Sequence, residues 1–277
     1  MDRGWTASDT AELLRMPTAS DDKYSRGVVG LRTGSVAYPG AAVLGVEAAW
    51  RTGVGMVRYV GPERAASLVL ARRPETVTVE GRVQAWVIGS GTDPSVRAES
   101  ETAALRELLS GVAPVVVDAG ALDLAIGGTA PRIVTPHAGE HARLRAALGL
   151  GSEGTDAEGV AETARALKAC VVRKGSETVV AGADGSLIEL PVATPWLATA
   201  GTGDVLAGTI GAVVAGVVAR SAAEPSSQEI ARAAAAGAWL HARAGTIAVV
   251  SRGGGPVTAL DVAEALPAAV AGVLAEG

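Results

Sequence analysis

The chain has 277 residues, of which 48% are hydrophobic and 19% charged, and its formal net charge at pH 7 is −5. This composition excludes a disordered chain and fits one large α/β domain with a full core, which we expect to span residues 1–277. The acidic balance offers no basic face for nucleic acid, so a small-molecule ligand is expected. The single cysteine, Cys170, excludes an internal disulfide, and with no signal segment at the start it favours the cytoplasm.

The first 22 residues are expected to form a polar lead-in with one short helix from Thr6 to Arg15. Beyond it, short apolar strands alternate with helical segments of about 10 to 15 residues. Strands are expected at 28–29, 56–60, 85–88, 114–118, 132–135 and 170–173, and a hairpin at 178–180 and 186–189. Helices are expected at 39–51, 96–109, 139–148, 157–169, 205–219, 228–249 and 261–275.

This alternation predicts an α/β fold with a mostly parallel central sheet and helices on both faces. The longest apolar run, from Val205 to Ala219, is closed by Asp204 and Arg220. It is shorter than the roughly 20 residues that a membrane helix requires, so a buried core helix is expected and no membrane partner.

Polar or glycine-rich loops follow several predicted strands, at 89–93, 118–120, 135–140 and 174–178. Ligands of open parallel sheets lie beyond the carboxyl ends of the strands. We therefore expect these loops to converge on one crevice together with residues 201–204.

The stretch Gly201-Thr202-Gly203-Asp204 opens the long apolar helix. A glycine-rich turn at a helix start presents unpaired backbone N–H groups to an anion, and Asp204 stands where an acceptor's proton can be removed. These features predict a phosphoryl-transfer site. Two structural alternatives are an ordinary glycine turn and an Asp204 that only caps the helix.

Other polar residues also have two interpretations. Glu140 can bind a ligand or favour the positive end of a helix, whereas His137 lies in a polar loop and is unlike an inert core histidine. Lys174 suits a nucleotide phosphate, although most lysines are solvated. His241 lies among apolar residues and is expected to pack in the core, as is Cys170. Asp118 ends its strand.

Six blocks occur in one order along the chain: Tyr38-Pro39-Gly40-Ala41-Ala42, Gly89-x-Gly91, Asp118-Ala119, Thr135-Pro136-His137-x-Gly139-Glu140, Lys174-Gly175-x-x-Thr178 and Ala198-Thr199-x-Gly201-Thr202-Gly203-Asp204-Val205-Leu206-Ala207-Gly208. By these blocks, from about Lys23 to Ala248, the chain resembles the NAD(P)H-hydrate dehydratase family of the ribokinase-like fold. These enzymes repair hydrated NADH and NADPH.

The resemblance implies dehydration of the S-epimer at the expense of ADP or ATP, through a phosphorylated intermediate, with Asp204 as the catalytic base. We expect Asp204 to act as a base at its ordinary pKa of about 4. The implied substrate residues are Ala41, Gly91, His137 and Asp204. The implied nucleotide residues are Lys174, Gly175, Ser176, Glu177, Thr178 and Gly203. Backbone amides of Gly201, Thr202 and Gly203 are expected to hold the transferred phosphoryl group, and Glu140 to organise Mg²⁺ through water.

The chain departs from the family pattern at four places. The usual Gly-Pro-Gly-Leu-Gly is Gly89-Ser90-Gly91-Thr92-Asp93, Asp-Ala-Asp is Asp118-Ala119-Gly120, and His-Lys-Gly is Lys23-Tyr24-Ser25. Trp196 occupies a position that is usually small. We expect a separate epimerase as functional partner, and the resemblance implies a homo-oligomer. Two alternatives remain open: a vitamin-precursor kinase of the same fold, which would release a stable phosphate ester, and a non-catalytic adenine-nucleotide sensor.

Overall fold

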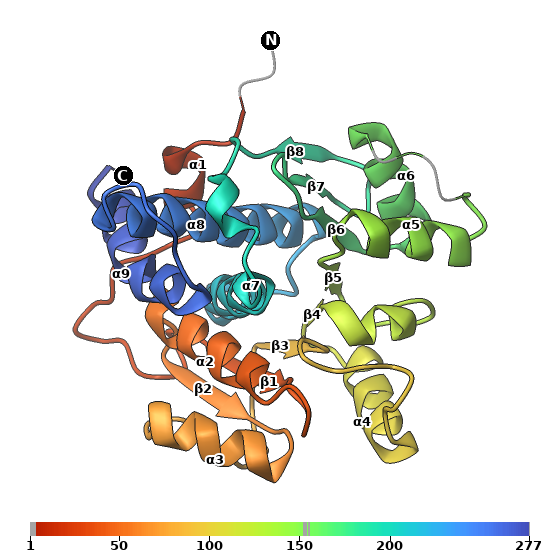
Figure 1. The fold of residues 1–277 in the computed structure, drawn as a ribbon, viewed down its shortest axis with the longest axis horizontal. Coiled ribbons are helices and arrows are strands. Elements are labelled where there is room, and N and C mark those ends of the chain that lie inside the picture. The colour runs from red at the N-terminus through yellow and green to blue at the C-terminus, as the bar shows by residue number, and fades with distance from the viewer. Residues whose placement is uncertain (1–3, 152–153, 155, 277) are drawn as a thin grey trace.

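The computed structural model describes residues 4–151, 154 and 156–276, and within them one sheet of eight strands crosses the molecule (Figure 1). The strand order is β2-β1-β3-β4-β5-β6-β7-β8. Strands β1 to β6 are parallel, and β7 and β8 add an antiparallel hairpin at one edge. The strands are β1 (Val28–Arg32), β2 (Met56–Tyr59), β3 (Ala85–Ile88), β4 (Val115–Val117), β5 (Arg132–Val134), β6 (Cys170–Arg173), β7 (Val179–Ala181) and β8 (Leu187–Glu189).

Helices cover both faces of this sheet, and each face has its own apolar core. The first core includes residues of α1 (Ala7–Ala11), α2 (Gly40–Thr52), α3 (Glu63–Arg72), α7 (Thr202–Arg220), α8 (Ser227–Ser251) and α9 (Ala259–Glu276). The second includes residues of α4 (Glu99–Leu109), the 3-10 helix η1 (Ala119–Leu124), α5 (Ala138–Ala147) and α6 (Ala157–Leu167). All three valines of β4 are buried because the strand is covered on both faces. The predicted fold class is confirmed.

The strand order reverses at β1, because β2 lies on one side of it and β3 on the other. The connection after β1 runs to one side of the sheet, and the connection after β3 runs to the other side. The two loops therefore separate and leave a crevice at the carboxyl ends of the two strands. The fold therefore places the loops after β1 and β3 at the mouth of a natural ligand site.

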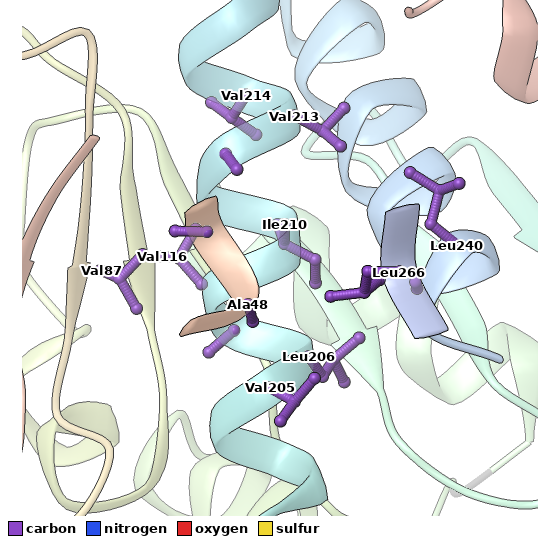
Figure 2. Close-up of a cluster of buried hydrophobic side chains, with 14 of the residues drawn as sticks. Ala48, Val87, Val116, Val205, Leu206, Ile210, Val213, Val214, Leu240 and Leu266 are labelled. Atoms are coloured by element: carbon purple, nitrogen blue, oxygen red, sulfur yellow. The ribbon is translucent and has the colours of Figure 1, made fainter. Parts of the chain in front are cut away.

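Helix α7 lies in the middle of the first core, packed between α2 and α8 and over β1, β3 and β4 (Figure 2). Its length and apolar composition would allow it to cross a membrane, but most of the helix is buried in the protein. Gly208 lets α7 approach α2 closely, since a Cβ there would lie 2.3 Å from the Gly45 carbonyl oxygen. Ile210 is fully buried, which contributes about 2 to 3 kcal/mol to stability. The expected buried core helix is confirmed.

The elements differ from the prediction at several ends. Helix α7 starts at Thr202 instead of Val205, and α1 ends at Ala11 instead of Arg15. Helix α3 was not predicted. Only Ala65 and Val69 of α3 are buried while its leucines are exposed, so its sequence shows a weak apolar face.

A charged cluster joins α2, α3 and α9. Glu47 of α2 is fully buried and accepts bonds from Arg51 at 2.5 Å, from Arg73 at 2.5 and 2.6 Å and from Arg72 at 3.3 Å. Arg72 also reaches Glu264 of α9 at 2.9 Å. Burial raises the pKa of Glu47, but the three guanidinium groups outweigh it and hold that pKa at about 2.

Candidate active site

Asp118 is the centre of a polar cluster at the carboxyl ends of β3 to β6. Its carboxylate is almost fully buried and accepts hydrogen bonds from Lys174 Nζ at 2.8 Å, Thr135 Oγ1 at 2.7 Å and Ser90 Oγ at 2.8 Å. Each partner follows a different strand, so the predicted convergence of the loops at one edge of the sheet is confirmed. Asp118 does more than end its strand, because it positions the lysine.

The Lys174 side chain is surrounded by carboxylates. Its Nζ lies 2.8 Å from Asp118 Oδ1 and 3.9 Å from Glu140 Oε2. Burial lowers the pKa of Lys174, but the negative charges of Asp118, Glu140 and Asp204 raise it above its ordinary value overall. Lys174 is therefore a fixed ammonium in the site and not a solvated surface lysine.

Asp204 lies in the first turn of α7, where the N-cap is Gly201 at φ 90°. Gly201 can adopt this left-handed conformation without strain. Asp204 is not the N-cap, so the capping interpretation is wrong. Burial, together with the charge of Asp118, raises the pKa of Asp204 to about 7, against a smaller opposing effect of Lys174. The expectation of an ordinary pKa near 4 is therefore also wrong, because the carboxyl is largely removed from water beside another carboxylate.

The backbone amides of the α7 start are only partly free. The Thr202 N–H donates to the Thr199 carbonyl at 3.3 Å, so this amide is occupied. Among the described residues, the N–H groups of Gly201, Gly203 and Asp204 have no acceptor. Gly203 also faces the lysine, since a Cβ there would lie 3.7 Å from Lys174 Nζ. A free anion-binding amide thus lies beside the ammonium group.

His137 and Glu140 form a capping box at the start of α5. The Glu140 carboxylate accepts from the His137 backbone N–H at 2.8 Å, and His137 Nδ1 accepts from the Gly139 N–H at 3.1 Å. Glu140 therefore stabilises the start of α5, which agrees with the structural interpretation of this residue. Its carboxylate still reaches toward Lys174, and the His137 side chain is 57% exposed and accessible to a ligand.

Ala41 and Gly91 meet at the reversal point between β1 and β3. Gly91 has φ 66°, and a Cβ there would lie 2.4 Å from the Ala41 Cβ, so glycine is required. Ala41 lies in the first turn of α2, and one turn later Gly45 packs against the backbone of Asp204. The predicted substrate residues Ala41 and Gly91 are thus brought together on the α2 side of the site.

The loop 174–178 connects β6 to β7 beyond the lysine. Thr178 Oγ1 donates to the Gly175 carbonyl at 3.2 Å, and the Ala193 N–H donates to the Ser176 carbonyl at 3.4 Å. Ser176 and Glu177 are exposed.

The donor set fits a magnesium ion that arrives with a nucleotide. The described residues contain no group of three or more His, Cys, Asp or Glu side chains that could hold a metal by themselves. Mg²⁺ is usually bound by one or two carboxylates together with phosphate oxygens and water. Glu140, whose side chain is 13% exposed, is the carboxylate that would suit such an ion, whereas Asp118 already accepts three hydrogen bonds.

Gly120 and Trp196 depart from the family pattern, and the structure shows what surrounds them. A Cβ on Gly120 would lie 2.1 Å from the Thr92 carbonyl oxygen, so the loop 89–93 occupies the space of any side chain at residue 120. Trp196, on the 3-10 helix η2 (Pro195–Leu197), is 42% exposed.

The two residues expected in the core are buried. Cys170 is among them, and burial raises the pKa of its thiol. His241 is the other, and burial lowers its pKa to about 4.

Ser90 and Thr135 lie in the loops expected to converge, but neither was singled out as a site residue. Both donate a hydrogen bond to Asp118. Asp118 itself follows three buried valines, which is the stronger signal.

Comparison with known proteins identifies close relatives. The family model described as NAD(P)H-hydrate dehydratase matches residues 29–268. A bifunctional NAD(P)H-hydrate repair enzyme of Mycobacterium tuberculosis is 44% identical over 76% of this chain and 46% of its own length. An ADP-dependent (S)-NAD(P)H-hydrate dehydratase of Xanthomonas campestris is 32% identical over 85% of this chain and 86% of its own. The chain thus spans about half the length of the bifunctional relatives it matches.

Solved structures show the same fold. The ADP/ATP-dependent NAD(P)H-hydrate dehydratase of Bacillus subtilis, co-crystallised with ATP and Mg²⁺, superposes with a TM-score of 0.83 at 27% identity, covering 98% of each chain. A protein of the ribokinase-like superfamily, at 22% identity, gives a TM-score of 0.81. The ribokinase-like fold that the resemblance implied is confirmed.

Proposed function

Because the chain belongs to the NAD(P)H-hydrate dehydratase family, we propose that it dehydrates the S-epimer of hydrated NADH and NADPH at the expense of ADP or ATP. The observation that carries this proposal is the arrangement of Asp204, Lys174 and the free Gly203 amide. A carboxyl group with a pKa of about 7 lies beside a fixed cation and an anion-binding helix start. This set suits proton removal from an acceptor hydroxyl during phosphoryl transfer.

The hydrated nicotinamide has a hydroxyl on a ring carbon next to nitrogen, and hydroxide is a poor leaving group. Asp204 accepts the hydroxyl proton while the oxygen forms a bond to the terminal phosphorus of ADP and the bond from that phosphorus to the AMP oxygen breaks. The lone pair of the ring nitrogen then expels phosphate. Loss of a ring proton restores the dihydropyridine, so the products are NAD(P)H, AMP and phosphate; with ATP the nucleotide product is ADP.

Charge on the transferred group is stabilised by groups that are already in place. We place the phosphoryl oxygens against Lys174 and the Gly203 N–H, with the Gly201 and Asp204 amides as further donors at the α7 start; the closeness of Gly203 to Lys174 and the lack of acceptors for these amides among the described residues support this. Glu140 is the carboxylate that would hold a Mg²⁺ ion through water, and such an ion would neutralise phosphate charge. Because Thr202 donates within the turn, we assign the anion-binding role to its neighbours.

The two substrates are assigned to different walls. We place the adenine nucleotide on Lys174, Gly203 and the loop 175–178, and the hydrated ring against Ala41, Gly91 and His137. Support comes from the position of Asp204 between α2, which carries Ala41, and the lysine.

Three further assignments extend the proposal. An epimerase activity is needed to convert the other epimer of the hydrate. We place the reaction in the cytoplasm, where the single buried cysteine stays reduced. A homo-oligomer is the expected assembly.

The decisive test mixes the protein with hydrated NADH, Mg²⁺ and either ADP or ATP. Recovery of NADH absorbance in step with phosphate release supports the dehydratase. Nucleotide consumption with a stable phosphate ester, and no recovery of NADH, indicates a small-molecule kinase instead. Nucleotide binding without consumption of any nucleotide indicates a sensor.

A further inference from the structure

A cavity of about 670 Å³ opens next to the Asp118 cluster, between η1, α5 and the loop after β3. This volume lies within the range of small-molecule sites. It shares Glu140 with the candidate active site, and Ala119 and Gly120 directly follow Asp118. The cavity is therefore continuous with the site at one end.

The lining combines an apolar floor with a free cation. Leu122 and Leu144 are buried in the floor, and Ile126 is 41% exposed at its edge. Among the described residues, the Arg143 guanidinium has neither an ion-pair nor a hydrogen-bond partner. By contrast, the acidic Asp123 is already paired with Arg97 at 2.6 Å. An unpaired guanidinium beside an apolar surface suits a ligand that carries phosphate and a flat ring.

Tyr38 links this cavity to the wall assigned to the hydrated ring. Its side chain is 61% exposed and lines the cavity, while its carbonyl oxygen would lie 2.9 Å from a Cβ on Gly91. Tyr38 is thus common to the cavity and to the surroundings of Gly91. No residue of the loop 174–178 lines the cavity, so it is separate from the wall assigned to the adenine nucleotide.

A hydrated dinucleotide reacts only at its nicotinamide ring, and its other half must lie somewhere along the protein. We propose that the cavity between η1 and α5 binds the non-reacting adenosine diphosphate half of hydrated NADH and NADPH, with Arg143 contacting a phosphate. This inference rests on the proposed function for the identity of the ligand. It assigns Arg143 and Tyr38 to substrate recognition, apart from the chemistry at Asp204.

The test compares two tryptophan variants of α5. Ala147 lines the cavity and its neighbour Ala146 does not, yet both are exposed. Ala147→Trp should raise KM for hydrated NADH at least 10-fold, leaving kcat and KM for ADP within twofold. Ala146→Trp should change none of these. Arg143→Gln should raise KM for hydrated NADPH about 10-fold or more, as expected for loss of a charge-assisted contact.

The outcomes separate this inference from the proposed function. If the wild-type protein is active and neither Ala147→Trp nor Arg143→Gln changes KM for either hydrate, the cavity assignment is overturned. If the wild type is inactive on both hydrates, calorimetry with ADP-ribose under saturating ADP decides. Binding that Ala147→Trp abolishes supports the cavity independently of the activity, and absence of binding overturns it.

Discussion

Lys174 Nζ lies 2.8 Å from Asp118 Oδ1, although 56 residues separate the two in the chain and β5 lies between their strands. The pair gives the buried carboxylate a counter-charge and fixes the ammonium at the mouth of the anion-binding turn. This one contact therefore affects both the stability of the protein around the buried Asp118 carboxylate and the ability of the site to bind phosphate.

The first prediction separates these two roles. Lys174→Met should weaken ADP binding and destabilise the protein by about 3 kcal/mol, because it leaves the buried Asp118 carboxylate without its cation. Adding Asp118→Asn to this variant should restore much of the stability but not the affinity for ADP. Urea unfolding and calorimetry measure the two effects. Unchanged ADP binding in Lys174→Met would remove the lysine from the nucleotide site.

The second prediction concerns the base. Asp204→Asn should lower kcat by roughly 10²-fold or more while ADP binding is largely kept, because the amide cannot accept the hydroxyl proton. Steady-state kinetics with hydrated NADH and calorimetry with ADP test this expectation. Near-normal turnover in the variant removes Asp204 from the mechanism.

The fold and the site were predictable to different degrees. The strands Val115–Val117 and Cys170–Arg173 were predictable because parallel strands buried on both faces read as continuous apolar runs. The start of α7 was not, since the conformation of Gly201 depends on packing against Leu44 and Ala259, from elements distant in sequence. The loops of the site were identified by their polarity, which is a local property.

The pKa of Asp204 and the Asp118 cluster could not be read in the same way. Both depend on groups that follow different strands and meet at the carboxyl ends of the sheet. No local sequence pattern shows that these groups lie close together in the fold. Thr135 and Ser90 lie in loops that the sequence singles out, but their hydrogen bonds to Asp118 form only when β3, β4 and β5 align. The electrostatic environment of the site therefore could not be predicted from the order of the residues.

The third prediction is a pH dependence. With its pKa raised to about 7, Asp204 is protonated below that pH and cannot accept a proton, so kcat/KM for hydrated NADH should increase with pH up to about 7 and then level off. Initial rates between pH 5 and 9 at hydrated NADH concentrations well below KM measure the profile. A rate that is flat from pH 5 to 8 would contradict a raised pKa in the working site.

The fourth prediction is that Asp204→Asn stabilises the protein at pH 8. The folded-state pKa of about 7 exceeds the unfolded value of about 4, so the folded state binds the proton more tightly and stability decreases as pH rises from 4 to 7. Above pH 7 the ionised Asp204 destabilises the folded state to its full extent. The difference between the two pKa values limits this destabilisation to about 4 kcal/mol. Urea unfolding at pH 8 should show a gain in the variant that shrinks toward pH 4.

The last prediction concerns Glu47 and acid stability. The folded-state pKa of about 2 lies below the unfolded value of about 4.3, so the three arginines stabilise the ionised form by about 3 kcal/mol at neutral pH. This stabilisation is complete above pH 5 and is lost as pH falls toward 2. Glu47→Gln should therefore unfold at lower urea concentrations at pH 7 and match the wild type near pH 2. Glu264→Gln is the control, because Glu264 shares Arg72 but its side chain is 47% exposed, and it should cost less than about 1 kcal/mol. Equal losses in the two variants would show that burial of Glu47 does not set the strength of the cluster.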